Sequence, residues 1–342
     1  MARGRASGAI ETFSAARGIA LPKGVVIRHI RRPDDYADMN RMANAARAAI
    51  GEDFTTTEAQ MAAYYDSPGR FVTDRDVAIV ELDGRFVGYA RTGLNEEVTG
   101  LHVYEVVPLL DPAVGSDPIY PLILSILEAH ARAIAVDDAA PEKTLETFGG
   151  DSAPELERHV LAAGFAPVRH SYSMVRPHLD DLPDAPLPEG LEIREVRPEH
   201  LRQIWDAAVE AFRDAWGATE ETEADWQRFL TDPIESDSSL WRIAWDGDEV
   251  AGQVRAYISP EENARFGRLR GYTESISVRR PWRRRGLARA LIAASFPLLR
   301  ARGMTEAALG VDTENVTGAL RVYEGCGFVP VSRQTTYRKP LD

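Results

Sequence analysis

The chain has 342 residues, of which 44% are hydrophobic and 27% charged, a composition typical of about two globular domains. Its formal net charge of -13 argues against a role on nucleic acid and favours a substrate that carries an amine. No apolar run is long enough to span a membrane, and the single cysteine, Cys326, favours a reduced, cytoplasmic location.

Residues 1–176 contain a series of predicted strands and helices. The first 20 residues carry scattered arginines without an apolar core, so we expect a flexible leader. Residues 177–190 hold four prolines and little apolar periodicity, which is typical of a linker. Between these segments we expect strands over 24–30, 76–82, 86–92, 101–110, 145–148 and 165–175, and helices over 34–50, 54–65, 119–136 and 154–163.

The same series starts again after the linker. The repeated features are Ile27-Arg28 and Ile193-Arg194, the helices over 34–50 and 198–212, the hairpin turns Asp83-Gly84 and Asp246-Gly247, and the Gly-Phe pairs at 164–165 and 327–328. The chain is therefore predicted to contain two tandem α/β domains, over 21–176 and 191–342. Each is expected to have a mostly antiparallel central sheet flanked by helices.

The second copy contains a basic turn between a strand and a helix. Glu274, Ile276 and Val278 alternate with serines, as in a strand, and an apolar helix follows Gly286. A helix N-terminus has unpaired backbone N–H groups and a partial positive charge, so this turn is suited to an anion such as a pyrophosphate. A solvated basic turn is the alternative. The residues concerned are Arg283, Arg284, Arg285, Gly286, Leu287 and Ala288.

Two motifs in this stretch resemble signatures of one enzyme family. Arg283-x-x-Gly286-x-Ala288 is similar to the acetyl-CoA pyrophosphate loop of the GNAT N-acetyltransferases. Downstream, Asn315 followed by a helix that ends in Tyr323 and then Gly327-Phe328 resembles the second signature of that family. The two-copy architecture is similar to that of mycothiol synthase, a tandem member of the family.

The resemblance implies which residues bind the cofactor, acetyl-CoA. Backbone groups near Ile276 and Val278 would polarise the thioester carbonyl and pair with the pantetheine arm. Asn315 would hydrogen-bond the same arm, although an ordinary helix cap is the alternative for this residue. The implied cofactor-binding residues are Ile276, Val278, Arg283, Arg284, Arg285, Gly286, Leu287, Ala288 and Asn315, and no metal is expected.

The resemblance also implies a general acid among the residues of the second copy. Tyr323 would be the general acid that protonates the departing CoA thiolate, the alternative being an ordinary core tyrosine. Glu274 is our candidate for the general base, acting through water, and it could instead orient a cationic substrate. Solvent or the terminal carboxylate of Asp342 are further candidates for the base.

The first copy lacks the corresponding residues. When the repeats are aligned, Pro112 stands opposite Arg283, Asp117 opposite Ala288 and Val160 opposite Tyr323. Carboxylates beside a pyrophosphate would repel it. The second copy is therefore predicted to bind the cofactor, and the first to be a structural partner that shapes the substrate cleft. The alternative for the first copy is that it binds another ligand of its own.

Together these observations predict an N-acetyltransferase that moves an acetyl group directly from acetyl-CoA to a primary amine of a small molecule. A non-catalytic acyl-CoA sensor and an acetyltransferase for protein N-termini or lysines are the alternatives. No nucleic-acid or membrane partner is expected, and the protein is expected to be a monomer or a homodimer.

Overall fold

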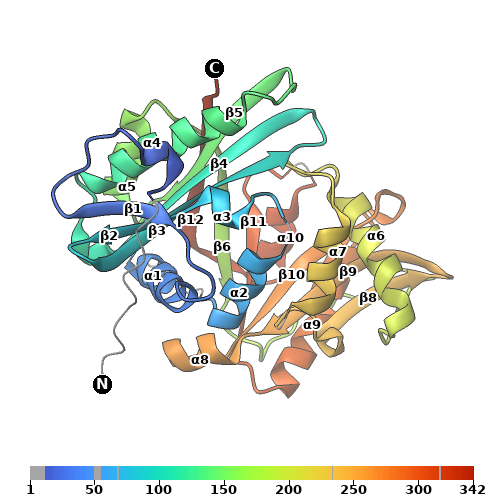
Figure 1. Cartoon of the computed structure of the whole chain (residues 1–342). Coiled ribbons are helices and arrows are strands. Elements are labelled where there is room, and N and C mark those ends of the chain that lie inside the picture. Colours follow the sequence, from blue (N-terminus) through green and yellow to red (C-terminus); the bar gives the residue numbers. More distant parts are fainter. Residues whose placement is uncertain (1–11, 50–54, 68, 233, 316) are drawn as a thin grey trace.

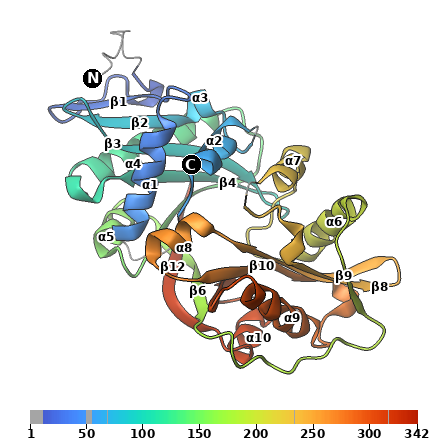
Figure 2. The same cartoon turned by 90° about the horizontal axis from the view of Figure 1, so that it is seen from below.

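The computed structural model describes residues 12–49, 55–67, 69–232, 234–315 and 317–342, and within them twelve strands form one continuous sheet (Figures 1 and 2). The strands are β1 (Val25–His29), β2 (Val77–Leu82), β3 (Arg85–Glu96), β4 (Leu101–Leu110), β5 (Glu142–Gly150), β6 (Ala166–Arg176), β7 (Glu192–Arg194), β8 (Trp241–Asp246), β9 (Glu249–Ile258), β10 (Arg270–Val278), β11 (Glu306–Asp312) and β12 (Val329–Pro340). The α-helices are α1 (Tyr36–Ala49), α2 (Glu58–Asp66), α3 (Thr73–Asp76), α4 (Ile119–Ile134), α5 (Pro154–Ala162), α6 (Leu201–Phe212), α7 (Glu223–Thr231), α8 (Pro260–Phe266), α9 (Leu287–Ala301) and α10 (Ala319–Gly325).

The two copies exchange their last strands. β6 ends the first copy along the chain, yet it pairs antiparallel with β11 of the second copy. β12, the last strand of the chain, pairs with β5 on one edge and with β6 on the other. The order in the sheet is therefore β1-β2-β3-β4-β5-β12-β6-β11-β10-β9-β8-β7, and β12 crosses the middle of the molecule (Figure 1).

Because of this exchange, the two predicted domains do not coincide with the two halves of the sheet. The segments 21–176 and 191–342 describe the order along the chain, but neither contains all the strands of its own half of the sheet. We call β1–β5 with β12 the N-terminal half, and β6–β11 the C-terminal half. The prediction of a mostly antiparallel sheet with flanking helices is confirmed, since only β4–β5 and β10–β11 pair in parallel within the described residues.

Helices cover both faces of the N-terminal half. In β2, Val77 and Ile79 pack into the cluster beneath α1 and α2, while Ala78 and Val80 pack on the opposite face beneath α4. This is why β2 is an almost continuous apolar run and not a simple alternation of apolar and polar residues.

The C-terminal half has the same layers. α6 covers a cluster with Trp241 and Ile243, and α9 covers the other face, where Ala244 lies. Sequence reasoning missed α7 and α8, which are short. Both have a side-chain N-cap, since Thr222 and Ser259 accept backbone N–H groups of their helices.

Two connecting segments differ from expectation. Phe13 is 0% exposed in the core of the N-terminal half and Thr12 bridges to Arg28, so the predicted flexible leader is wrong for these residues. The linker over 177–190 forms no helix or strand, as predicted, but Leu179 is 2% exposed in the core of the C-terminal half. Residues 1–11 and the predicted helix ends Ile50 and Phe54 lie outside the described residues.

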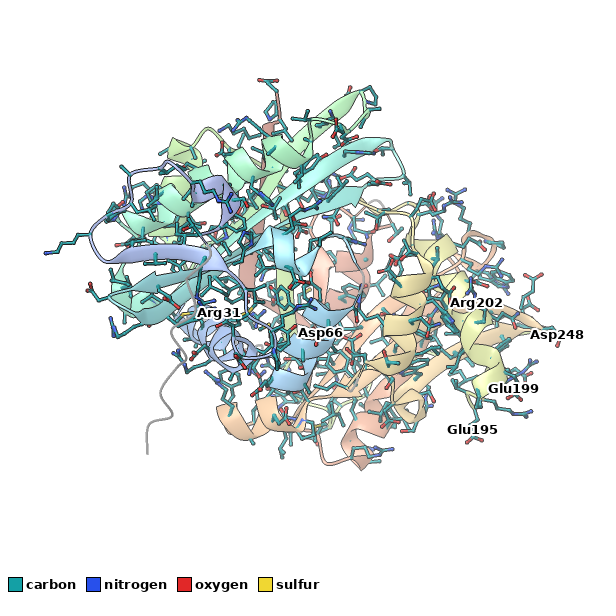
Figure 3. The ribbon with its side chains drawn as sticks, in the orientation of Figure 1. Arg31, Asp66, Glu195, Glu199, Arg202 and Asp248 are labelled. Atoms are coloured by element: carbon teal, nitrogen blue, oxygen red, sulfur yellow. The ribbon has the colours of Figure 1, made fainter. Side chains whose placement is uncertain are left out.

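Several charged side chains are labelled at the surface in Figure 3. Glu195, Glu199, Arg202 and Asp248 project from the outer end of the C-terminal half, away from the N-terminal half. Among the described residues, no helix could span a membrane, and no cluster of three or more His, Cys, Asp or Glu side chains could hold a metal ion.

Candidate active site

The predicted active-site strand, β10, separates from its parallel neighbour. β10 pairs with β11 only from Arg270↔Glu306 to Tyr272↔Ala308, and its remaining residues have no partner on that edge. On its other edge the register with β9 shifts between Glu274 and Ser277, and Ser275 has a φ of 49°. Ile276 lies in this bulge, where its backbone groups are outside the ladder. The separation and the bulge together leave unpaired backbone groups at the predicted position.

Glu274 spans the gap between the two strands. One of its carboxylate oxygens, Oε1, accepts a hydrogen bond of 2.9 Å from the backbone N–H of Gly310 in β11. Burial raises the pKa of Glu274 to about 8, although the Gly310 N–H acts in the opposite direction, and the nearby Glu235 carboxylate adds to the rise. A carboxyl group with this pKa can gain and lose a proton near neutral pH.

The basic turn presents backbone donors. α9 begins at Leu287 after Gly286, whose φ is 84°, and Arg284 also has a positive φ of 61°. Among the described residues, the backbone N–H groups of Arg284, Arg285 and Gly286 donate no hydrogen bond to protein atoms. A Cβ built on Gly286 would meet nothing within 4 Å. The turn is therefore an open nest of N–H groups at a helix N-terminus, as an anion site requires.

The side chain of Arg283 faces the protein. Its guanidinium donates to the backbone carbonyls of Val278 at 2.9 Å and Ala211 at 3.0 Å, and pairs with Asp214 at 2.7 Å. Arg280 binds the same carboxylate, and the two arginines hold the pKa of Asp214 well below its usual range. Arg283 thus fixes the turn onto the end of α6, and the free donors of the turn are backbone N–H groups.

Tyr323 lies in the core of the C-terminal half near this gap. It is 7% exposed, and its ring meets Phe328 edge-on with centroids 6.5 Å apart. Burial raises the pKa of its hydroxyl well above the ordinary value, and the Glu274 carboxylate contributes to this rise. Tyr323 is therefore protonated at neutral pH, as a general acid must be. Cys326 is fully buried, and burial raises the pKa of its thiol, which agrees with a packing role.

Asn315 lies in the turn before α10, whereas the last strand carries Asp342 to the N-terminal half. The Asn315 side-chain oxygen accepts the backbone N–H of Thr317 at 2.8 Å, so it caps the turn before α10. Asp342 follows Leu341, which packs into the core of the N-terminal half and donates its N–H to the Lys143 carbonyl at 3.1 Å. The terminal carboxylate is thereby removed from Tyr323 as a candidate base, because β12 carries it to the other half.

Sequence reasoning missed three charged residues around this site. Asp214 holds the basic turn in place. Arg255 stands opposite Glu274 in the register of β9 and β10, and its guanidinium lies over the Trp241 ring. Glu235 perturbs the pKa of Glu274. None belongs to a recognisable motif, since each is brought to the site by folding from a different element.

The comparisons with known proteins agree with this geometry. Residues 201–328 match the family model described as the acetyltransferase (GNAT) family. A mycothiol acetyltransferase of Salinispora arenicola is 28% identical over 312 residues, which are 90% of this chain and 94% of that protein. The crystal structure of a GCN5-related N-acetyltransferase from Sphaerobacter thermophilus has a TM-score of 0.71 at 24% identity, covering 94% of this chain and 97% of that one.

A tandem GNAT protein from the clavulanic acid biosynthesis pathway shares the fold, with a TM-score of 0.62 at 15% identity, covering 93% of this chain and 99% of that one. Residues 201–328 therefore contain a GNAT acetyltransferase domain, and the resemblance to that family drawn from sequence motifs is confirmed for this segment. Its enzyme class is that of the acyltransferases.

Proposed function

We propose that the C-terminal half transfers an acetyl group from acetyl-CoA to a primary amine of a small molecule, directly and with both substrates bound. The observation that carries this proposal is the Glu274 carboxyl group, which lies between two separated strands with a pKa of about 8. An amine acceptor must lose a proton to become a nucleophile, and a carboxylate poised near neutral pH can take it.

The cofactor would bind along the turn and the separated strands. Its pyrophosphate would accept hydrogen bonds from the N–H groups of Arg284, Arg285 and Gly286, with Leu287 and Ala288 opening the helix behind them. The pantetheine arm would pair with the unpaired edge of β10 as an added strand would. Acetyl-CoA supplies the activated acetyl group, and Ile276 in the bulge would offer its backbone N–H to the thioester oxygen.

The proposed step balances its protons. The amine nitrogen bonds to the acetyl carbon, the carbon–sulfur bond breaks, and the CoA sulfur leaves as a thiolate. The cationic amine first gives one proton through water to Glu274 and so becomes the nucleophile, and the thiolate receives a proton from Tyr323. The second proton that the nitrogen loses as the amide forms passes to the Tyr323 phenolate, and Glu274 then releases its proton to solvent.

The proposed acceptor, a small-molecule amine, is supported by the names of the relatives and by the charges near the site. Relatives that align over most of their length are named mycothiol acetyltransferases, which favours a small-molecule acceptor over a protein. The carboxylates of Glu274 and Glu235 near the site favour an acceptor that arrives as a cation.

The test is release of the CoA thiol from acetyl-CoA over a panel of small amines, with a lysine peptide as the protein-type acceptor and mass spectrometry to identify the amide. We expect thiol release with at least one small amine. Tyr323→Phe should lower kcat about 100-fold, while calorimetry shows nearly unchanged acetyl-CoA binding. Acetyl-CoA binding without transfer to any amine would support the sensor, and transfer to the peptide alone would support a protein acceptor.

A further inference from the structure

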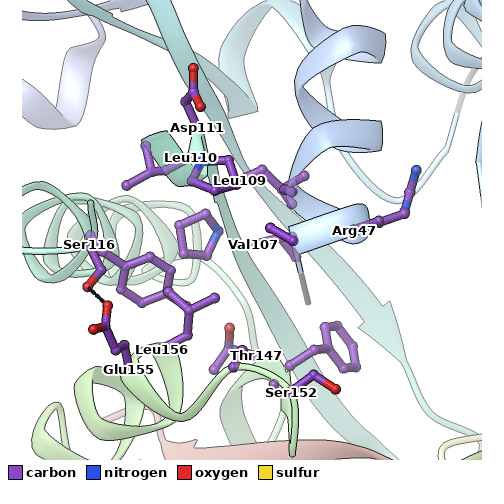
Figure 4. Close-up of a pocket in the computed structure, with 18 of the residues that line it drawn as sticks. Arg47, Val107, Leu109, Leu110, Asp111, Ser116, Thr147, Ser152, Glu155 and Leu156 are labelled. Carbon is purple, nitrogen blue, oxygen red and sulfur yellow. Dashed lines mark hydrogen bonds between the residues drawn. The ribbon is translucent and has the colours of Figure 1, made fainter. Parts of the chain in front are cut away.

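The N-terminal half contains a cavity of about 620 Å³ at the place that corresponds to the cofactor cleft of the C-terminal half (Figure 4). It lies where β4 and β5 separate, beside the starts of α4 and α5 and the end of α1. Its walls are mostly apolar, with Val107, Leu109, Tyr120, Phe148 and Leu156 among the lining residues. A cavity of this volume is in the range of small-molecule sites.

In the turn beside this cavity, the three N–H groups that correspond to those of Arg284, Arg285 and Gly286 are already hydrogen-bonded to the protein. The Ala113 N–H donates to the Asp111 carboxylate at 2.9 Å, the Val114 N–H to the Asp111 carbonyl at 2.9 Å, and the Gly115 N–H to the Pro112 carbonyl at 3.4 Å. Pro112 has no N–H at all. The matching turn of the C-terminal half, by contrast, leaves three N–H groups unused, so the two turns differ in backbone geometry as well as in charge.

The charged groups around the cavity also disfavour an anion. Asp111 and Glu155 place carboxylates on its lining, and Glu155 accepts a hydrogen bond from Ser116 at 3.3 Å (Figure 4). Arg47 supplies a cation, but its guanidinium is hydrogen-bonded to Thr56 at 3.3 Å. A phosphate group entering this cavity would therefore meet repulsion from the carboxylates, without the three free N–H groups of the turn in the C-terminal half to offset it.

The cavity does offer partners for an amide. The β4–β5 ladder ends at Glu105↔Glu146, and the following residues of both strands have no partner on the edge that faces the cavity. Their other edges remain paired, with β3 and β12 respectively. Thr147, on the cavity wall, is 1% exposed, and its hydroxyl makes no hydrogen bond with any other described residue. A hydroxyl on the cavity wall can donate a hydrogen bond to a ligand amide or accept one from it.

From these observations we infer that the N-terminal half binds a small, uncharged ligand with an apolar body and at least one amide group, and that it excludes phosphate-bearing ligands such as CoA. The amide pairs with the open edges of β4 and β5 and with Thr147, and the apolar part fills the cavity. This inference does not depend on acetyl transfer in the C-terminal half.

The experiment measures binding to the full chain by titration calorimetry. The probe is N-octanoylglycine methylamide, and octyl phosphate is the matched anionic compound with the same alkyl chain. Ala46→Trp places a large side chain at the cavity lining, and Ala48→Trp is its control, because Ala48 is exposed on the same helix and does not line the cavity. Thr147→Val keeps the side-chain shape and removes the hydroxyl.

We expect the wild-type chain to bind the amide probe, with Ala46→Trp weakening binding at least about 10-fold and Ala48→Trp leaving it unchanged. Thr147→Val should weaken it about 3- to 10-fold, the effect of one hydrogen bond. Failure of the wild type to bind the amide probe would overturn the inference, as would equal binding by Ala46→Trp. It would also be overturned if octyl phosphate or CoA bound in a manner that Ala46→Trp blocks. If Ala46→Trp does not fold, Thr147→Val decides, and unchanged amide binding by that variant counts against the inference.

Discussion

Replacing Glu274 with glutamine should stabilise the fold at alkaline pH while reducing activity. The pKa of Glu274 rises from 4.5 in the unfolded chain to about 8 in the folded one, because burial disfavours the charged form. Below pH 4.5 the carboxyl is protonated in both states. Between 4.5 and 8 only the folded state keeps the proton, so the contribution of Glu274 to stability falls as the pH rises and reaches its minimum above pH 8.

The size of this effect follows from the same values. A rise from 4.5 to about 8 corresponds to a ceiling of about 5 kcal/mol, and partial exposure of Glu274 to water reduces it to about 2–4 kcal/mol. Glutamine keeps an oxygen that can accept the Gly310 N–H and carries no charge. The free energy of unfolding of Glu274→Gln relative to wild type should therefore increase by that amount between pH 5 and pH 9.

The assay is denaturant unfolding of both proteins at the two pH values, with Glu324→Gln, an exposed site on α10, as the control. In parallel, kcat/KM for acetyl transfer by the wild type should rise with pH around 8, and Glu274→Gln should lose that rise together with about 100-fold in rate. If the stability difference between Glu274→Gln and wild type is the same at pH 5 and pH 9, then Glu274 is not a desolvated carboxyl group and the reasoning fails.

Three further predictions concern the turn and the exchanged strands. Arg283→Ala and Asp214→Asn should each raise KM for acetyl-CoA about 10-fold. The double variant should be no worse than the poorer single variant, because both substitutions remove the same Arg283–Asp214 ion pair. Additive losses in the double variant would contradict this. Gly286→Val and Gly303→Val should each cost about 1–2 kcal/mol in unfolding experiments, because both glycines have a positive φ and open space around them, but only the first should weaken acetyl-CoA binding in calorimetry. The last prediction concerns two segments expressed separately, residues 12–180 and 188–342. Neither should fold alone, because each lacks a strand of its half, and co-expression should restore a complex. Two separately folded monomers, seen by circular dichroism and gel filtration, would refute the exchange.

Most of the local structure could be predicted from the sequence. The strand over 101–110 has the observed bounds, and the turns at Asp83-Gly84 and Asp246-Gly247 lie where the structure has hairpins. These features depend on apolar periodicity and on turn residues, which act over a few positions. The internal repeat similarly indicated two copies of one unit, because equivalent elements appear in the same order.

The candidate site was predicted only in part. The position of the turn and of Gly286 follows from the motif, but the inward direction of the Arg283 side chain depends on Asp214 and on the Ala211 carbonyl, about 70 residues away. The bulge at Ser275 likewise arises from the register between two strands. Such features cannot be read from spacing, since they are set by partners distant in sequence.

The sequence by itself determined which residue types stand at the strand-to-helix junction, and that this junction is basic in the second copy and acidic in the first. Only the tertiary structure decided the path of the last strand. β12 leaves the C-terminal half after Phe328 and places Leu341 in the core of the other half, which moves Asp342 away from Tyr323. The physical reason is that the periodicity of a strand and its backbone hydrogen bonds do not specify its neighbours. The choice depends on side-chain packing, in which Tyr337 of β12 fills the core of the N-terminal half and Met174 of β6 that of the C-terminal half.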